Sequence, residues 1–186
     1  MTGSDTVTFE NTNSNSLIKT LDLINVGVTV SAGSHFSTIK IAGQIDKDIN
    51  LNISADTALS TTGSSKDLFV NASGKSVTLN SSTATQDIII KNSNNTDITA
   101  ASAQGNVAIT SNGDVMLRDL SALKGNIDIT NIGKITVTDA TNANGTLTLN
   151  NARAPLGTDI TITDANSAGK VTIKSAGSIT ATSNNG

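Results

Sequence analysis

A unit of about 20 residues, written twice between Gly105 and Asp139, constrains this chain more than any other feature. Each copy opens with Gly-Asn, continues with a run in which every second residue is apolar, breaks at a glycine, and resumes with a second alternating run. A period of two predicts half-buried strands, because successive side chains of a strand point to opposite faces. We expect the glycine and asparagine residues at the breaks to adopt the positive φ angles of tight turns.

The same unit continues in both directions along the chain. The first strand of each unit is predicted to begin near Leu68, Ile88, Val107, Ile127, Leu147 and Val171. The second strand is predicted to begin near Val77, Ile98, Val115, Ile135, Ile160 and Ile179. The step from Leu147 to Ile160 is longer and contains Pro155, the only proline; because proline cannot donate to a strand ladder, we expect an inserted loop there.

Equivalent residues recur one unit later, so like strands stack on like strands in parallel, as in a parallel β-helix. Before Leu68 the register weakens, although apolar alternation persists. The sequence therefore predicts an all-β solenoid of two or three short strands per coil, forming a single segment over 1–186. Residues 1–66 are expected to form less regular coils than residues 67–186. Roughly nine coils spaced by about 4.8 Å would make a rod near 40 Å long.

Composition narrows the possible functions. Hydrophobic residues make up 36% of the chain, which favours a narrow core, and no cysteine is present for disulfides or thiolate chemistry. A net charge of −3 and the lack of Trp and Tyr argue against a nucleic-acid partner. No apolar run reaches membrane-spanning length, and no signal peptide is visible. Either the chain acts inside the cell or it is a segment of a longer secreted polypeptide.

Three aspartates are the candidate metal ligands. Counting four residues on from the starts of three second strands gives Asp119, Asp139 and Asp164, which would stack about 4.8 Å apart along one edge. Each aspartate lies an even number of residues after an inward-facing strand residue, so a continuing strand would point its side chain into the core. Because burying unpaired charges is costly, the chain must turn a corner before each aspartate. Two outcomes are open: solvent and nearby lysines screen the carboxylates, or Ca²⁺ is held between coils. The glycine-rich nonapeptide of calcium-binding β-rolls is absent.

Other titratable residues give weaker indications of chemistry. His35 could be a general base or a metal ligand, but no second His or Cys completes a site, which favours a corner residue beside a turn. Asp46 and Asp48 could form a carboxylate pair, although glycoside hydrolysis also needs a cleft, and a charged loop gives the same spacing. Glu10 is isolated. No catalytic residue and no organic cofactor is predicted.

Several stretches, among them GNVAITSNGDVML, GNIDITNIGKITVTDA and GKVTIKSAGSITATSNNG, resemble repeats of filamentous haemagglutinin-type adhesins. These are two-partner-secreted exoproteins of Gram-negative bacteria, and autotransporter passenger domains are similar. The resemblance covers at least Asp67 to Gly186. It implies a right-handed β-helix at the cell surface or outside the cell, acting as a stalk or adhesive surface. The family's secretion domain, with its asparagine-proline-asparagine-glycine motif, is not found, which suggests an internal fragment.

The resemblance implies a non-catalytic rod that attaches to host cells, matrix or other bacteria, as in biofilm formation and virulence. Its partners would be a surface receptor or glycan, and an outer-membrane secretion partner for the parent protein. One alternative is an enzyme that degrades acidic polysaccharide, which would need a groove lined by Asp with Arg or Lys. Another is ice binding through a flat threonine array, for which Thr136/Thr138, Thr146/Thr148 and Thr161/Thr163 supply patches.

Overall fold

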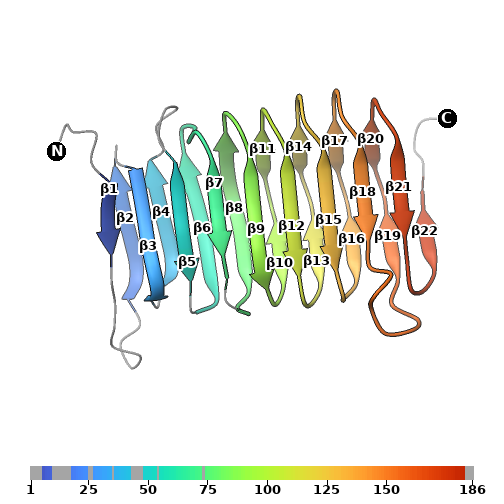
Figure 1. Ribbon diagram of the computed structural model, residues 1–186, viewed down its shortest axis with the longest axis horizontal. Coiled ribbons are helices and arrows are strands. Elements are labelled where there is room, and N and C mark those ends of the chain that lie inside the picture. Colours follow the sequence, from blue (N-terminus) through green and yellow to red (C-terminus); the bar gives the residue numbers. More distant parts are fainter. Residues whose placement is uncertain are drawn as a thin grey trace.

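The chain winds as a right-handed parallel β-helix, whose successive coils run from the N-terminal to the C-terminal end of a column (Figure 1). The structure, a computed structural model, describes residues 6–9, 18–24, 27–34, 36–42, 48–53, 55–72 and 74–182. All regular structure in these ranges is β-strand, and no helix among them is long and apolar enough to cross a membrane. The predicted all-β solenoid with coils of about 20 residues is confirmed.

One face of the column, called the A face, is a nine-stranded parallel sheet. Its strands are β1 (Thr6–Phe9), β3 (Gly27–Ser34), β5 (Ile49–Ile53), β7 (Leu68–Asn71), β9 (Ile88–Ser93), β12 (Val107–Ser111), β15 (Ile127–Asn131), β18 (Leu147–Asn150) and β21 (Val171–Lys174). From β7 onward these strands begin at the six predicted positions.

The opposite side of the column is a single face up to β6 (Thr57–Thr62). At β8 (Val77–Ala84) it divides into two faces, called the B face and the C face. The B face contains β2 (Ile18–Ile24), β4 (Phe36–Ala42), β6, the first part of β8, β10 (Thr96–Ile98), β13 (Val115–Leu117), β16 (Ile135–Val137), β19 (Ile160–Ile162) and β22 (Ile179–Ala181). The C face contains the last part of β8, followed by β11 (Ala101–Ala103), β14 (Leu120–Ala122), β17 (Ala140–Asn142) and β20 (Ala165–Ser167).

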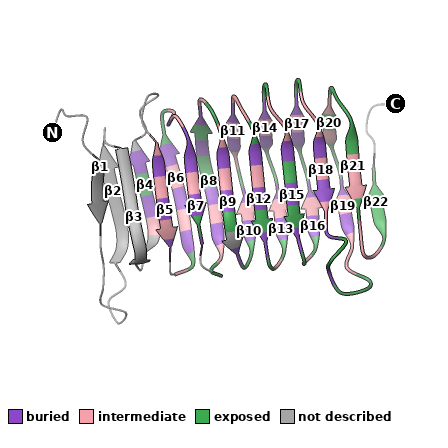
Figure 2. Ribbon diagram, in the orientation of Figure 1, coloured by how far each residue is buried: buried purple, intermediate pink, exposed green. Residues whose placement is uncertain are grey.

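The core consists of buried apolar side chains from successive coils, and Figure 2 shows buried positions recurring from strand to strand. On the A face, Ile88, Val107, Ile127 and Leu147 pair in consecutive register, and none of them has exposed surface. The strands alternate buried and more exposed residues, which is the period that predicted them. Burying one such side chain contributes about 1.5–3 kcal/mol, so the free energy of folding accumulates coil by coil.

Two strand predictions need correction. The second strand of one coil begins at Thr96 and not at Ile98, because Thr96 is buried and its hydroxyl shares a 2.7 Å hydrogen bond with Ser93 Oγ. The segment before Gly125, for which the sequence predicts no strand, contains β14. The inward residues of β14 are Leu120 and Ala122, and the small size of alanine concealed the strand pattern.

The corner glycines of the regular coils allow close backbone packing between coils, and they do not supply the positive φ angles that the sequence predicts. Among the described glycines, positive φ angles occur at Gly63, Gly74 and Gly157, so the turn prediction is wrong for the glycines of the regular coils. At Gly133, an added Cβ would lie 2.4 Å from the backbone carbon of Gly113. Glycine is required there because the corners of successive coils stack backbone on backbone.

Candidate functional site

The three predicted aspartates do form a column. The carbonyl oxygens of Asp139 and Asp164 accept hydrogen bonds from Leu120 N and Ala140 N, both at 3.2 Å, which places the three residues at equivalent corners of successive coils. Each aspartate immediately precedes a C-face strand, and each is exposed. The chain therefore turns between the B and C faces at this point, as the cost of burying a carboxylate required.

The three aspartates form a linear column, one residue per coil, and not a compact cluster. Among the described residues, no group of three or more His, Cys, Asp or Glu side chains lies close enough to hold a metal ion. Asp139 Oδ1 instead accepts a 3.5 Å hydrogen bond from Thr141 Oγ1 within its own coil. The stacking prediction is thus confirmed in register. The calcium hypothesis stays a prediction, to be tested by the effect of calcium on stability.

Beside the aspartate column, the outward side of the C face carries a column of polar side chains. Thr83, Ser102, Ser121, Thr141 and Asn166 pair in consecutive register along β8, β11, β14, β17 and β20. At the N-terminal end of this face the surface dips into an open depression of about 200 Å³. It is lined by Ser81, Ser82, Thr83, Ala100, Ala101, Ser102, Asp119 and Ser121.

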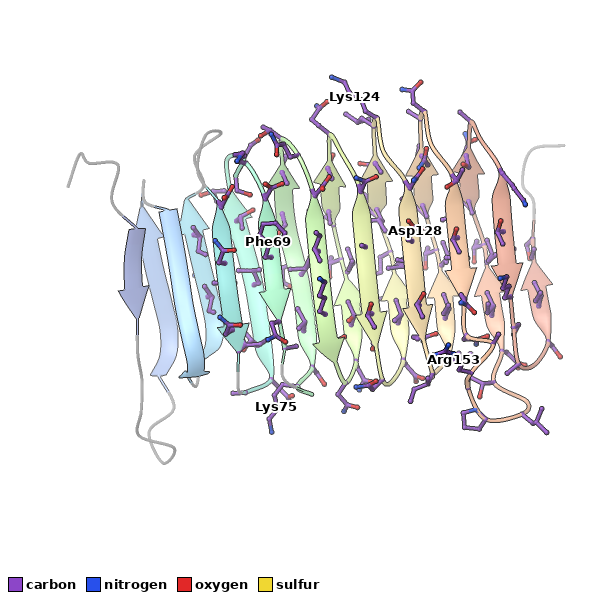
Figure 3. All side chains as sticks on the ribbon, in the orientation of Figure 1. Phe69, Lys75, Lys124, Asp128 and Arg153 are labelled. Atoms are coloured by element: carbon purple, nitrogen blue, oxygen red, sulfur yellow. The ribbon has the colours of Figure 1, made fainter. Side chains whose placement is uncertain are left out.

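The predicted inserted loop is present between β18 and β19, and Figure 3 shows it projecting from the column with Arg153 on it. Two turns build it: Ala154 N donates to Asn151 O at 2.8 Å, and Thr158 N donates to Pro155 O at 3.1 Å. Leu156 lies within the second turn and is 96% exposed. A large apolar side chain that is so fully exposed on a defined loop is available for contact with a partner.

A buried amide anchors this loop to the column. Asn151 has no exposed surface, and its Nδ2 donates to Gly133 O at 3.2 Å and to Thr158 O at 3.3 Å. Its Oδ1 accepts from Ala176 N in the next coil, also at 3.2 Å. One side chain thus links three coils below the loop. The sequence pattern gave no signal for this role, because asparagine is abundant throughout the chain.

Threonines align on the B face near the C-terminal end. Thr136, Thr161 and Thr180 pair directly across β16, β19 and β22. Thr138, Thr163 and Thr182 follow two residues later, and all three are exposed. Thr148 lies on β18 of the A face, so the pair Thr146/Thr148 does not belong to this array. The alignment of Thr180 with the other two threonines was missed at the sequence level.

The remaining candidates are not brought together as a site. His35, Glu10 and Asp46 lie outside the described residues. Asp48 Oδ1 lies 3.7 Å from Lys66 Nζ, in an ion pair whose side chains are both partly exposed. The ion pair is consistent with Asp48 being a charged residue of the loop before β5. This is the charged-loop alternative to a catalytic pair of carboxylates at Asp46 and Asp48.

Comparison with protein families, with characterised proteins and with solved structures finds no match.

Proposed function

We propose that this chain is a non-catalytic rod segment of a secreted or surface-anchored bacterial adhesin, mediating attachment to host cells, matrix or other bacteria. The observation that carries the proposal is the unbroken parallel pairing of A-face strands from β1 to β21. A column built this way adds length with each coil while keeping a narrow core. Together with the resemblance to filamentous haemagglutinin-type repeats, this architecture suits a stalk that holds contact surfaces away from a cell.

The outward surface offers two kinds of contact. One is the polar C face with its aspartate edge, and the other is the loop that carries Arg153 and Leu156. The proposal places the protein outside the cell, with an outer-membrane partner secreting its parent polypeptide. Neither contact surface requires membrane insertion or nucleic acid.

Adhesion of coated beads tests the proposal. Beads coated with the purified chain should attach to epithelial-cell monolayers, to immobilised matrix proteins or to bacterial lawns above the level of albumin-coated beads. Adding the soluble chain should inhibit the attachment of the beads in a dose-dependent manner. Attachment no greater than that of albumin on all three surfaces would contradict the proposal.

Ice binding is a second candidate, favoured by the three consecutive coils of aligned threonines on the B face. Repeated hydroxyl and methyl groups at the strand spacing could order a layer of water. A thermal hysteresis measurement on the intact chain tests this. Ice crystals that grow at the same temperature and with the same shape as in buffer would exclude it.

A further inference from the structure

The depression on the C face lies where the aspartate column gives way to smaller side chains, at Ala100 and Ser81. Ala101 N donates to Asp119 O at 2.9 Å, so Ala100 occupies the corner that Asp119, Asp139 and Asp164 occupy in the next three coils. A methyl group there replaces a carboxylate, and the surface falls between Ser81 and Asp119. Three successive coils line the resulting hollow.

The lining is rich in polar groups that are free to bind a ligand. The hydroxyls of Thr83, Ser102 and Ser121 form a column with a spacing of about 4.8 Å, and Ser81 and Asp119 stand at its edge. Within the described part of the chain, none of these four hydroxyls makes a hydrogen bond to another protein group. One coil beyond, Thr141 is engaged with Asp139. The hydroxyls around the depression therefore remain available, each able to donate and to accept.

We propose that this depression, called the Ala100 depression, binds one ring of a neutral sugar. A sugar ring presents several hydroxyl donors and acceptors within a small volume, which matches the serine and threonine lining. The carboxylate of Asp119 can accept two hydrogen bonds from neighbouring sugar hydroxyls. The volume of about 200 Å³ is below the roughly 300–1,000 Å³ of drug-sized ligand sites, so it suits a single ring.

Charge selects against acidic sugars. Asp119 lies at the depression, and Asp139 and Asp164 continue the same edge over the next two coils. A sugar carboxylate would meet like charge at this edge, with no lysine or arginine among the lining residues to offset it. The inference rests on the adhesive function proposed above, for which it names the chemistry of the receptor.

A nuclear magnetic resonance titration of the labelled chain tests the binding. Methyl glycosides of glucose, galactose and mannose serve as probes, and N-acetylneuraminic acid serves as the acidic comparison. At least one neutral glycoside should give saturable shifts, with a millimolar Kd, at the amides of Ala100, Ser102 and Ser121. The acidic sugar should shift them at least tenfold more weakly. No saturable shift with any neutral glycoside, or shifts spread evenly over all faces, would overturn the proposal.

A matched pair of substitutions separates binding from folding. Ala100→Asp restores the residue carried by the next three coils, so the column should fold while the depression fills. Ala108→Asp makes the same change on the A face, where Asp128 is the register partner of Ala108 in the next coil. We expect the Kd to rise at least tenfold in Ala100→Asp and to stay unchanged in Ala108→Asp. Equal binding by both variants would overturn the assignment.

Bead adhesion with the same two variants separates this inference from the proposed function. Loss of adhesion in Ala100→Asp but not in Ala108→Asp would support both. Adhesion that survives Ala100→Asp would overturn the role of the depression in attachment and leave the adhesive rod standing. Sugar binding by a chain that adheres to nothing would overturn the proposed function and leave the sugar site standing.

Discussion

The side-chain Oδ1 of Asn106 accepts a hydrogen bond from the backbone N–H of Asn126, one coil later, at 2.9 Å. The same contact joins Asp87 to Asn106 at 2.7 Å and Asn126 to Thr146 at 2.9 Å. Each corner side chain satisfies a backbone donor of the next coil, which no strand could reach at the turn. The ladder explains why Asp or Asn precedes the first strand in four successive coils, at Asp67, Asp87, Asn106 and Asn126.

Removing one step of this ladder should destabilise the column measurably. Asn106→Ala leaves the N–H of Asn126 without its partner, and the expected loss is about 1 kcal/mol in the free energy of unfolding. Asn112→Ala is the matched control, because Asn112 is exposed and contributes only its backbone N–H to the described hydrogen bonds. Urea denaturation of both variants makes the comparison, and equal midpoints would contradict the role of the ladder.

Backbone stacking at the corners predicts a larger effect for glycine. Gly133→Ala places a Cβ 2.4 Å from the backbone carbon of Gly113, so two coils must separate or tilt. We expect a loss of about 1–3 kcal/mol, as for an overpacked interior. Gly74→Ala is the comparison: its added Cβ has open space, and its positive φ alone opposes the change, at about 1 kcal/mol. A Gly133→Ala variant as stable as the parent would disprove close stacking.

The apolar columns predict a gradient of stability along the chain. Ile127 is fully buried at the centre of its column, and Ile127→Ala should cost about 2–5 kcal/mol. Val171 occupies the same column two coils later but is 45% exposed, so Val171→Ala should cost under about 1 kcal/mol. Thermal unfolding of the two variants gives the test. Similar losses of stability at both positions would contradict a core whose contribution to stability depends on how deeply each coil is buried.

Calcium should leave the stability unchanged. The exposed aspartates stack one per coil, and within the described residues no cluster of ligands surrounds a single point. We therefore expect equal melting temperatures in excess Ca²⁺ and in excess chelator. A rise of several degrees in calcium, lost in the variant Asp139→Asn, would restore the calcium column as an explanation for these residues.

Much of the fold could be predicted because its main signal is the period of apolar side chains. Strands such as Val107–Ser111 and Ile127–Asn131 place Ile or Val at their first two inward positions, so their starts and register follow from the sequence. The C face escaped prediction because its inward residues are mostly alanine, and a strand of Ala101, Ser102 and Ala103 looks like a loop.

The candidate site was predictable only in part. Equal spacing was enough to place the three aspartates on one edge. It does not show that Ala100 belongs to the same column, because the apolar pattern predicts the B-face strand of that coil from Ile98, two residues after its start at Thr96. The backbone hydrogen bonds between neighbouring coils are what place Ala100 at the corner next to Asp119, beside the depression.

Distances between spin labels test the central claim, that each coil stacks on the last in parallel register. The chain has no cysteine, so pairs of introduced cysteines can be labelled specifically. Thr110 and Lys174 lie three coils apart on the A face, and Asn71 and Lys174 lie five coils apart. At about 4.8 Å per coil, the backbone separations should be about 14 Å and about 24 Å. Pulsed electron resonance should show the second pair farther apart by about 10 Å; equal distances, or a shorter second distance, would contradict the stacked column.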